Sequence, residues 1–171
     1  MIRGVSLIFL LRTDKILLMM RMRSPMYACT STTVASIVPL MTNDRQMRVR
    51  LEAEATLCIQ EHIRRGTLEL VWSYMLDFEN AANPFEERRT TISGWRQYAT
   101  LDVEETPLIL QHANRLAGMG LKAKDALHIA CAIAGACPYF VTTDDDILKR
   151  KPDVHDITLI DPTALVREMN L

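Results

Sequence analysis

The chain has 171 residues, of which 49% are hydrophobic and 24% are charged, and these values are typical of one soluble globular domain. A count of 20 basic against 21 acidic residues leaves a formal net charge of −1, which argues against a protein that coats nucleic acid through bulk charge. The composition also disfavours intrinsic disorder, collagen-like repeats and a small disulfide scaffold.

The first 24 residues do not follow one clear pattern. The apolar run Val5–Leu11 is too short to span a bilayer, and no small-residue cleavage site of a secretory signal follows it. The region fits a β-hairpin that turns at Thr13–Lys15, a poorly ordered extension, or translated sequence upstream of the true start. We interpret residues 1–24 as an N-terminal appendage of uncertain order and residues 25–171 as one domain. Membrane attachment through residues 1–24 is an alternative hypothesis, and we favour a protein without a membrane partner.

Strand and helix patterns alternate through the first half of the domain. Pro25–Cys29 is a short candidate strand, and Gln46–Arg65 is predicted as an amphipathic helix. Leu68–Ser73 is predicted as a strand, Met75–Ala82 as a short helix, and Pro84–Tyr98 as a helix with proline in its first turn. The apolar positions of the first helix, opposite its charged face, are Val49, Leu51, Ala55, Leu57, Ile59 and Ile63.

The second half of the domain continues this alternation. Lys122–Ala136 is the most apolar helix, and because apolar residues cover nearly all of its faces, we expect it to be buried on most sides. Asp161 and Pro162 predict the start of a terminal helix, with Asp as the N-cap. The other predicted elements are, in chain order, a strand at Ala99–Val103, a helix at Thr106–Met119, a strand at Tyr139–Thr142, a helix at Asp146–Arg150 and a strand at Ile157–Ile160.

Strands separated by helices predict βαβ units, and therefore a parallel sheet with helices on both faces. The active sites of such sheets lie beyond the C-terminal ends of the strands. Carboxylates occur at three such places. Asp77 and Glu79 follow the strand Leu68–Ser73, Asp125 opens the buried helix, and Asp144 begins a run of three aspartates. Converging carboxylates suit Mg²⁺ or Mn²⁺, which activate water and stabilise displacement at a phosphodiester.

Each of these carboxylates also has an ordinary structural explanation, because Asp and Glu stabilise the first turns of helices. We favour that explanation for Asp146, and for Asp77 the two interpretations are equally supported. Asp125 is harder to explain in this way, because a carboxylate at the start of the most buried helix is costly unless it is paired. His128 lies one turn later and is more simply explained as a satisfied core histidine than as a residue that supports a metal.

Four stretches of the chain, RVRLEAEA, LDFENAANP, GLKAKDALHIACA and YFVTTDDDILKR, resemble the PIN-domain family, in particular the VapC-type toxin ribonucleases and their solitary relatives. The resemblance covers roughly residues 25–165. Its most specific motifs are Lys-x-x-Asp-Ala-Leu-His at a helix start and Thr-Thr-Asp-Asp after a strand. It implies a three-layer α/β sandwich with a parallel, roughly five-stranded sheet. It also implies a ribonuclease that depends on Mg²⁺ or Mn²⁺, in some members as the toxin of a toxin–antitoxin pair.

The resemblance assigns roles to individual residues. The family's acidic positions fall on Glu79, Asp125 and Asp144, the implied catalytic residues and metal ligands, with Asp145 as an accessory ligand. The hydroxyl of Thr143 is implied to assist this site. The implied partners are an RNA substrate, a small antitoxin protein and a second copy of the chain in a homodimer, in the cytoplasm.

The first acidic ligand of the family is absent from this chain. Cys29 stands where the family has Asp, while Thr30 and Ser31 keep the neighbouring positions. A thiol is neutral near pH 7 unless activated, and its sulfur is a poor ligand for Mg²⁺. Residues 31–41 also depart from the family pattern. Two functions therefore stay open: a metal-dependent ribonuclease, and a catalytically weakened PIN-fold protein that binds RNA or an antitoxin without cutting.

Basic residues cluster locally despite the balanced net charge. Lys122 and Lys124 adjoin Asp125, so we expect them to bind the phosphate backbone of RNA near the metal. The pairs Arg64-Arg65 and Arg88-Arg89 are better explained as solvated helix faces. The four cysteines form no CxxC pair and no cluster at zinc spacing, which fits reduced thiols in a cytoplasm. The sequence contains no GxGxxG or Walker motif that would indicate a nucleotide cofactor.

Overall fold

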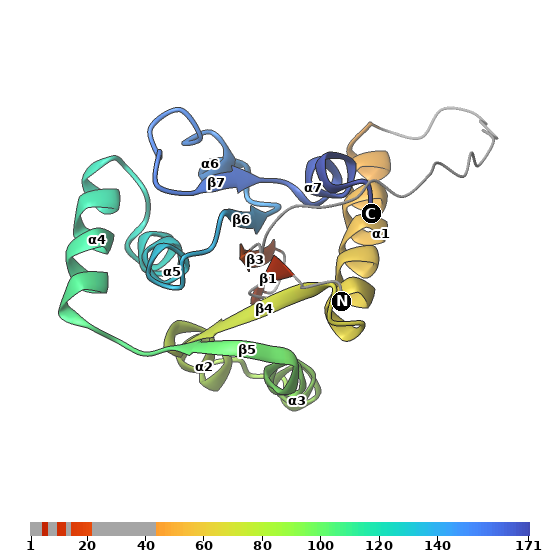
Figure 1. Cartoon of the computed structure of the whole chain (residues 1–171), viewed down its shortest axis with the longest axis horizontal. Helices are drawn as coiled ribbons and strands as arrows, with labels where there is room; N and C mark the ends of the chain where they lie inside the picture. Colours follow the sequence, from red (N-terminus) through yellow and green to blue (C-terminus); the bar gives the residue numbers. More distant parts are fainter. Residues whose placement is uncertain (1–4, 7–9, 13–14, 22–43) are drawn as a thin grey trace.

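A computed structural model describes residues 5–6, 10–12, 15–21 and 44–171. Its elements form three layers, with a central sheet between two groups of helices (Figure 1). The helices α1 (Asp44–Arg64) and α7 (Pro162–Met169) pack against each other on one side of the sheet. The helices α4 (Pro107–Gly118) and α5 (Ala123–Ala134) pack together on the other side. The expected arrangement of helices on both faces is therefore present.

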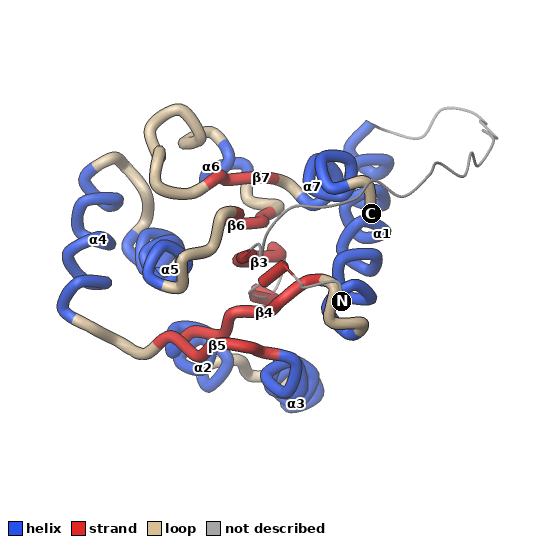
Figure 2. Tube along the Cα trace, in the orientation of Figure 1, coloured by secondary structure: helices blue, strands red, loops and turns tan. Residues whose placement is uncertain are grey.

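Two parallel strand pairs form the two halves of the sheet. β4 (Leu68–Ser73) pairs in parallel with β5 (Ala99–Val103), and β6 (Tyr139–Thr142) pairs in parallel with β7 (Thr158–Ile160). β3 (Lys15–Arg21) lies between β4 and β6 and runs antiparallel to both, so it connects the halves (Figure 2). The strand order is β5-β4-β3-β6-β7, with two further short strands at the N-terminus.

The N-terminal strands require a correction to the expected sheet. β2 (Leu10–Arg12) pairs antiparallel with β3, and Arg12 lies opposite Lys15, which agrees with the hairpin, one of the three interpretations left open for this region. β1 (Val5–Ser6) pairs in parallel with β4. The sheet is thus mixed rather than parallel. The sequence could not predict this, because an unbroken apolar run such as that of β3 suits a strand covered by helices on both faces but does not specify the direction of that strand. The candidate strand Pro25–Cys29 lies outside the described residues.

The helix boundaries follow local capping. Thr106 accepts a hydrogen bond from the N–H of Ile109 at 3.3 Å to begin α4, and Asp161 accepts one from Ala164 at 2.8 Å to begin α7. Both caps are followed by proline at the first helical position, which has no N–H to leave unpaired. The remaining helical elements are α2 (Tyr74–Ala81), α3 (Glu86–Trp95), a 3₁₀ turn η1 (Arg96–Tyr98) and α6 (Asp145–Leu148).

Helix α3 begins later than the sequence predicted. Proline at position 84 was expected in its first turn, but the helix starts at Glu86. The side chain of Asn83 accepts a hydrogen bond from the N–H of Phe85 at 3.1 Å, and Phe85 keeps an extended backbone. The Asn-Pro turn therefore continues for two residues before the helix can start.

The core is aliphatic with a few large aromatic side chains, including the fully buried Trp72 and Phe140. Helix α5 is buried along most of its length, as predicted. The prediction for α1 is confirmed for Ala55, Ile59 and Ile63, which are buried at intervals of four residues. It is wrong for Val49, Leu51 and Leu57, which are exposed. Within the described ranges, none of the helices has the length and apolarity needed to cross a membrane.

Candidate active site

Three nearly buried carboxylates lie where β4 and β6 end and where α5 begins. Glu79 belongs to α2, which follows β4 directly, and its side chain is 12% exposed. Asp125 lies in the first turn of α5 and is 5% exposed. Asp144 is the N-cap of α6, just after β6, and is 3% exposed. Because buried carboxylates are costly unless they are compensated, these three positions are the strongest candidates for function.

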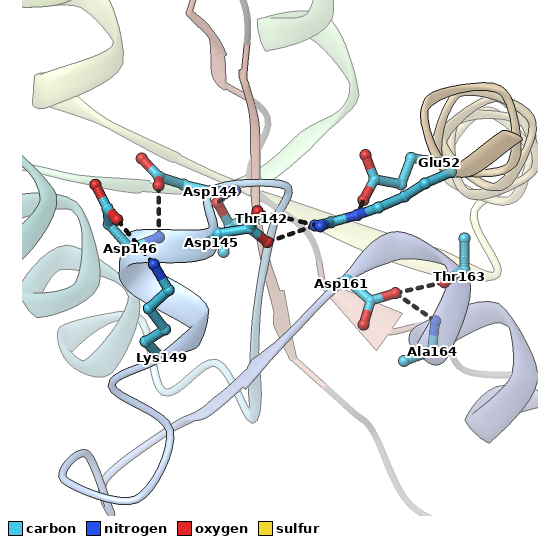
Figure 3. A network of polar contacts seen from close by, with 10 residues as sticks. Glu52, Thr142, Asp144, Asp145, Asp146, Lys149, Asp161, Thr163 and Ala164 are labelled. Atoms are coloured by element: carbon cyan, nitrogen blue, oxygen red, sulfur yellow. Dashed lines mark hydrogen bonds and ion pairs between the residues drawn. The ribbon is translucent and has the colours of Figure 1, made fainter. Parts of the chain in front are cut away.

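Asp144 is fixed by the turn between β6 and α6. Its backbone N–H donates to the hydroxyl of Thr142 at 3.0 Å, and its carboxylate accepts the N–H of Asp146 at 2.9 Å (Figure 3). The second bond caps the short helix. The resemblance implied that the hydroxyl of Thr143 assists this site. The threonine with this hydrogen bond is its neighbour Thr142, and Thr143 is partly buried.

Glu79 lies against two basic side chains from α5. The Lys124 Nζ is 3.4 Å from its Oε1, and the His128 Nε2 is 3.4 Å from its Oε2. His128 is buried, and its contact with Glu79 has the distance of an ion pair without the geometry of a hydrogen bond. Neither ring nitrogen of His128 has a hydrogen-bond partner among the residues that the structure describes. His128 is thus a core residue in contact with a candidate catalytic group.

These contacts keep Glu79 ionised. Burial favours the neutral acid and raises the pKa of Glu79, but the contacts with His128 and Lys124 outweigh burial and leave the pKa below its ordinary value. Glu79 is therefore a carboxylate at neutral pH. Lys124, which is predicted to bind RNA, also contacts Glu79 and has a side chain that is 51% exposed.

Asp145 follows Asp144 in the chain, and its carboxylate is bound by an arginine of α1. Its carboxylate accepts hydrogen bonds from both terminal nitrogens of Arg48 on α1, at 2.5 and 3.1 Å. Arg48 also donates to Glu52 one turn further along α1, at 2.8 Å. Asp145, which is predicted as an accessory ligand, thus connects α6 to α1. Sequence reasoning missed this contact, because 97 residues separate the partners.

Asp77, for which the sequence left two explanations open, has a structural role. Its Oδ1 accepts a hydrogen bond from the indole N–H of the buried Trp72 at 3.0 Å. Its Oδ2 accepts one from Arg96 at 3.1 Å. Asp77 therefore fixes Trp72 in the core and connects α2 to η1.

A pocket of about 430 Å³ opens between the starts of α5 and α6, and Asp125 is part of its wall. Asp146 lies on the same wall and, as predicted, in the first turn of a helix, where Lys122 and Lys149 approach it at 3.3 and 3.5 Å. Because the N–H of Asp146 binds the carboxylate of Asp144, the pocket adjoins two of the three candidate carboxylates.

The donor set has the chemistry of a hard divalent ion, since all three candidates supply carboxylate oxygens. No three His, Cys, Asp or Glu side chains lie close enough to hold a metal among the residues described in the structure. Mg²⁺ commonly binds through one or two carboxylates and keeps its other positions for water and substrate phosphate, so Asp125 and Asp144 fit it without a third protein ligand. The expected first-ligand position Cys29 and its neighbours Thr30 and Ser31 lie outside the described residues.

Two of the three described cysteines are buried. Among the described residues no disulfide is formed by Cys58, Cys131 or Cys137, and the buried ones are Cys131 and Cys137. Burial raises the pKa of the Cys131 thiol to about 12, so it is protonated at neutral pH.

Comparison with known proteins gives one match. The family model described as PIN domain matches residues 37–153, which is more than half of the chain and includes all three candidate carboxylates. Neither the curated proteins nor the solved structures that were searched gave a match.

Proposed function

The chain belongs to the PIN-domain family, whose members have a nuclease-like fold, and from this premise we propose that it is a divalent-metal-dependent endoribonuclease. Asp125 and Asp144 would hold Mg²⁺ or Mn²⁺, which supplies an activated water and charge stabilisation at a scissile phosphate. Glu79 would act beside them as an ionised carboxylate held by Lys124 and His128. The observation that carries the proposal is the burial of Asp125 and Asp144 at one end of the sheet.

Within this proposal the chain's own groups hold the acidic site in shape. The Thr142 hydroxyl and the Asp146 N–H fix Asp144, and the first turn of α5 fixes Asp125. Such preorganisation matters because a carboxylate that must rotate into place binds a metal ion more weakly.

The resemblance to VapC-type toxins suggests the biological role and the partners of the enzyme. We propose that the enzyme is the toxin of a toxin–antitoxin pair, acts in the cytoplasm as a homodimer and is held by a small antitoxin protein. Purification together with the product of a neighbouring small reading frame tests this setting, and a stable complex whose RNA cleavage is blocked is the expected result.

The test of the activity is RNA cleavage in Mn²⁺ by the full chain and its Asp125→Asn variant. We expect Asp125→Asn to reduce cleavage by at least about 100-fold, because it removes a candidate ligand. Asp102→Asn is the matched control, since Asp102 is an exposed carboxylate on β5 paired with Arg96. Circular dichroism of each variant separates loss of activity from loss of folding. Cleavage that survives Asp125→Asn would count against the proposal.

A second candidate function is a PIN-fold protein that binds RNA or an antitoxin without cutting. It is favoured by Cys29 at the first-ligand position and by the two side chains, Lys124 and His128, that already contact Glu79. Cys29→Asp distinguishes the two functions. If only Cys29→Asp cleaves RNA, and Cys29→Asp combined with Asp125→Asn does not, the site is a PIN site disabled at its first ligand. Cleavage by the unchanged chain supports the ribonuclease.

A further inference from the structure

The pocket between α5 and α6 carries more positive charge than the acidic site it adjoins. Three cations and two carboxylates line it, and the cations come from the start of α5 and from the end of α6 and the residues after it. The complete lining is Gly120, Leu121, Lys122, Asp125, Asp146, Ile147, Lys149 and Arg150. A pocket with this charge pattern fits an anion that approaches from solvent, rather than an apolar ligand.

Two of the cations share one exposed carboxylate. Lys122 and Lys149 contact different oxygens of Asp146, and the side chains of these lysines are 64% and 73% exposed. Ion pairs this exposed contribute little to stability, because water and salt screen them. The lysines can therefore exchange Asp146 for a phosphate oxygen at small cost, and Asp146 acts as an internal competitor for the same cations.

The guanidinium group of Arg150 packs closely against Gly120, which has no side chain in its way. Gly120 ends the turn after α4 with a φ of +91°, and a Cβ built there would lie 2.7 Å from the Arg150 Nη2. The guanidinium group thus lies against the backbone of Gly120, and both residues line the pocket. Its ion pair with Asp153, at 3.7 Å, is long and exposed, so it too can be exchanged.

We propose that this pocket binds a backbone phosphate of single-stranded RNA adjacent to the scissile one, through Lys122, Lys149 and Arg150. The inference rests on the proposed function, because it takes RNA as the substrate class. The wall residue Asp125 places the bound phosphate next to the candidate metal ligands. The pocket therefore sets the side from which the strand approaches, over the starts of α5 and α6.

The test measures binding of a short fluorescein-labelled single-stranded RNA by anisotropy in EDTA, where metal-dependent cleavage cannot proceed. We expect Lys122→Gln, Lys149→Gln and Arg150→Gln each to weaken binding several-fold. Each substitution should also reduce the slope of log affinity against log salt by about 0.7, the value for one phosphate contact on a single strand. Asp146→Asn should tighten binding by about 3-fold, because it frees two cations for phosphate.

The chain offers closely matched controls on α1. Glu61 is an exposed carboxylate that also holds two cations, Arg65 at 2.8 Å and Arg64 at 4.0 Å. It lies about 20 Å along the helix from Arg48, the α1 residue that contacts α6. Glu61→Gln and Arg65→Gln make the same charge changes at this distant place, and we expect both to leave RNA binding and its salt slope nearly unchanged.

The outcomes separate this inference from the proposed function. If the chain cleaves RNA but the pocket variants bind like the α1 controls, the pocket inference is overturned and the ribonuclease proposal stands. If the unchanged chain neither binds nor cleaves RNA, both are overturned. If the pocket variants weaken binding while the unchanged chain does not cleave, the pocket inference is supported, and the function that binds without cutting is favoured.

Discussion

At the scale of single residues, the two basic contacts of Glu79 have a consequence for stability against pH. The folded-state pKa of Glu79 is lowered, so the unfolded chain binds more protons as pH falls below about 4.5, the ordinary value. The stabilisation from Glu79 is therefore complete above this pH and is lost as pH falls through the lower folded-state value. We expect the difference in Tm between the unchanged chain and Glu79→Gln to shrink steadily on acidification. Thermal unfolding across pH measures this difference, and a difference that is constant from neutral to acidic pH would contradict it.

The residue pattern singled out Asp125, because a carboxylate that opens a buried apolar helix is costly unless it is paired. The resemblance to the PIN family then selected Glu79 and Asp144 among the other carboxylates. Their partners were harder to predict. His128 and Lys124 lie one turn apart on α5, yet Glu79 comes from α2, and nothing in the local sequence joins the two helices. The contact between Arg48 and Asp145 was missed for the same reason. The local spacing of apolar and polar residues indicates which side chains share one face of a helix or strand. An ion pair between distant elements depends instead on how those elements pack.

At the scale of elements, the ion pair of Arg48 with Asp145 anchors α6 to α1. Helix α6 has only four residues, so its position depends on such contacts more than on its own hydrogen bonds. A double-mutant cycle with Arg48→Gln and Asp145→Asn isolates the pair. We expect a coupling free energy of about 0.5–1 kcal/mol in urea unfolding, the upper range for exposed pairs, because the contact is bidentate.

The same cycle applied to Arg65 and Glu61 provides the comparison, since Glu61 lies in the last turn of α1 and Arg65 directly follows that helix. Hydrogen exchange adds a readout specific to position. Arg48→Gln should speed exchange of the Leu148 amide, whose N–H binds the Asp144 carbonyl at 2.9 Å in α6, and Arg65→Gln should not. Equal exchange in both variants, with no coupling energy, would show that α6 is held without Arg48.

The positions of most helices and strands could be predicted from the sequence, because local signals mark where these elements begin and end. Leu68–Ser73, Ala99–Val103 and Tyr139–Thr142 have the predicted limits, since β-branched or apolar runs end at turns or helix starts. The start of α3 shifted because the side chain of Asn83 stabilises the preceding turn. The direction and partners of β3 could not be predicted from local signals, because a single apolar run does not indicate which distant strand it pairs with or in which direction.

At the scale of the whole molecule, β3 holds the two halves of the sheet together. β4 and β6 each pair with β3, and the order of strands contains no direct pairing between them. The candidate carboxylates are divided accordingly, with Glu79 following β4 and Asp144 following β6. The geometry of the acidic site therefore depends on the strand between these halves, which the sequence had assigned to an appendage.

Proline substitution tests the central place of β3. Leu18 lies opposite Val141 of β6, whereas Leu11 belongs to β2, which pairs with β3 alone. Proline lacks the N–H that a ladder needs and is tolerated on edge strands but not in central ones. We expect Leu18→Pro to lower the free energy of unfolding by about 3 kcal/mol or more, and Leu11→Pro to lower it by much less. Urea unfolding of the full chain measures both. Equal and small effects would mean that another segment forms the centre of the sheet, and would remove β3 as the connection between the Glu79 and Asp144 halves of the site.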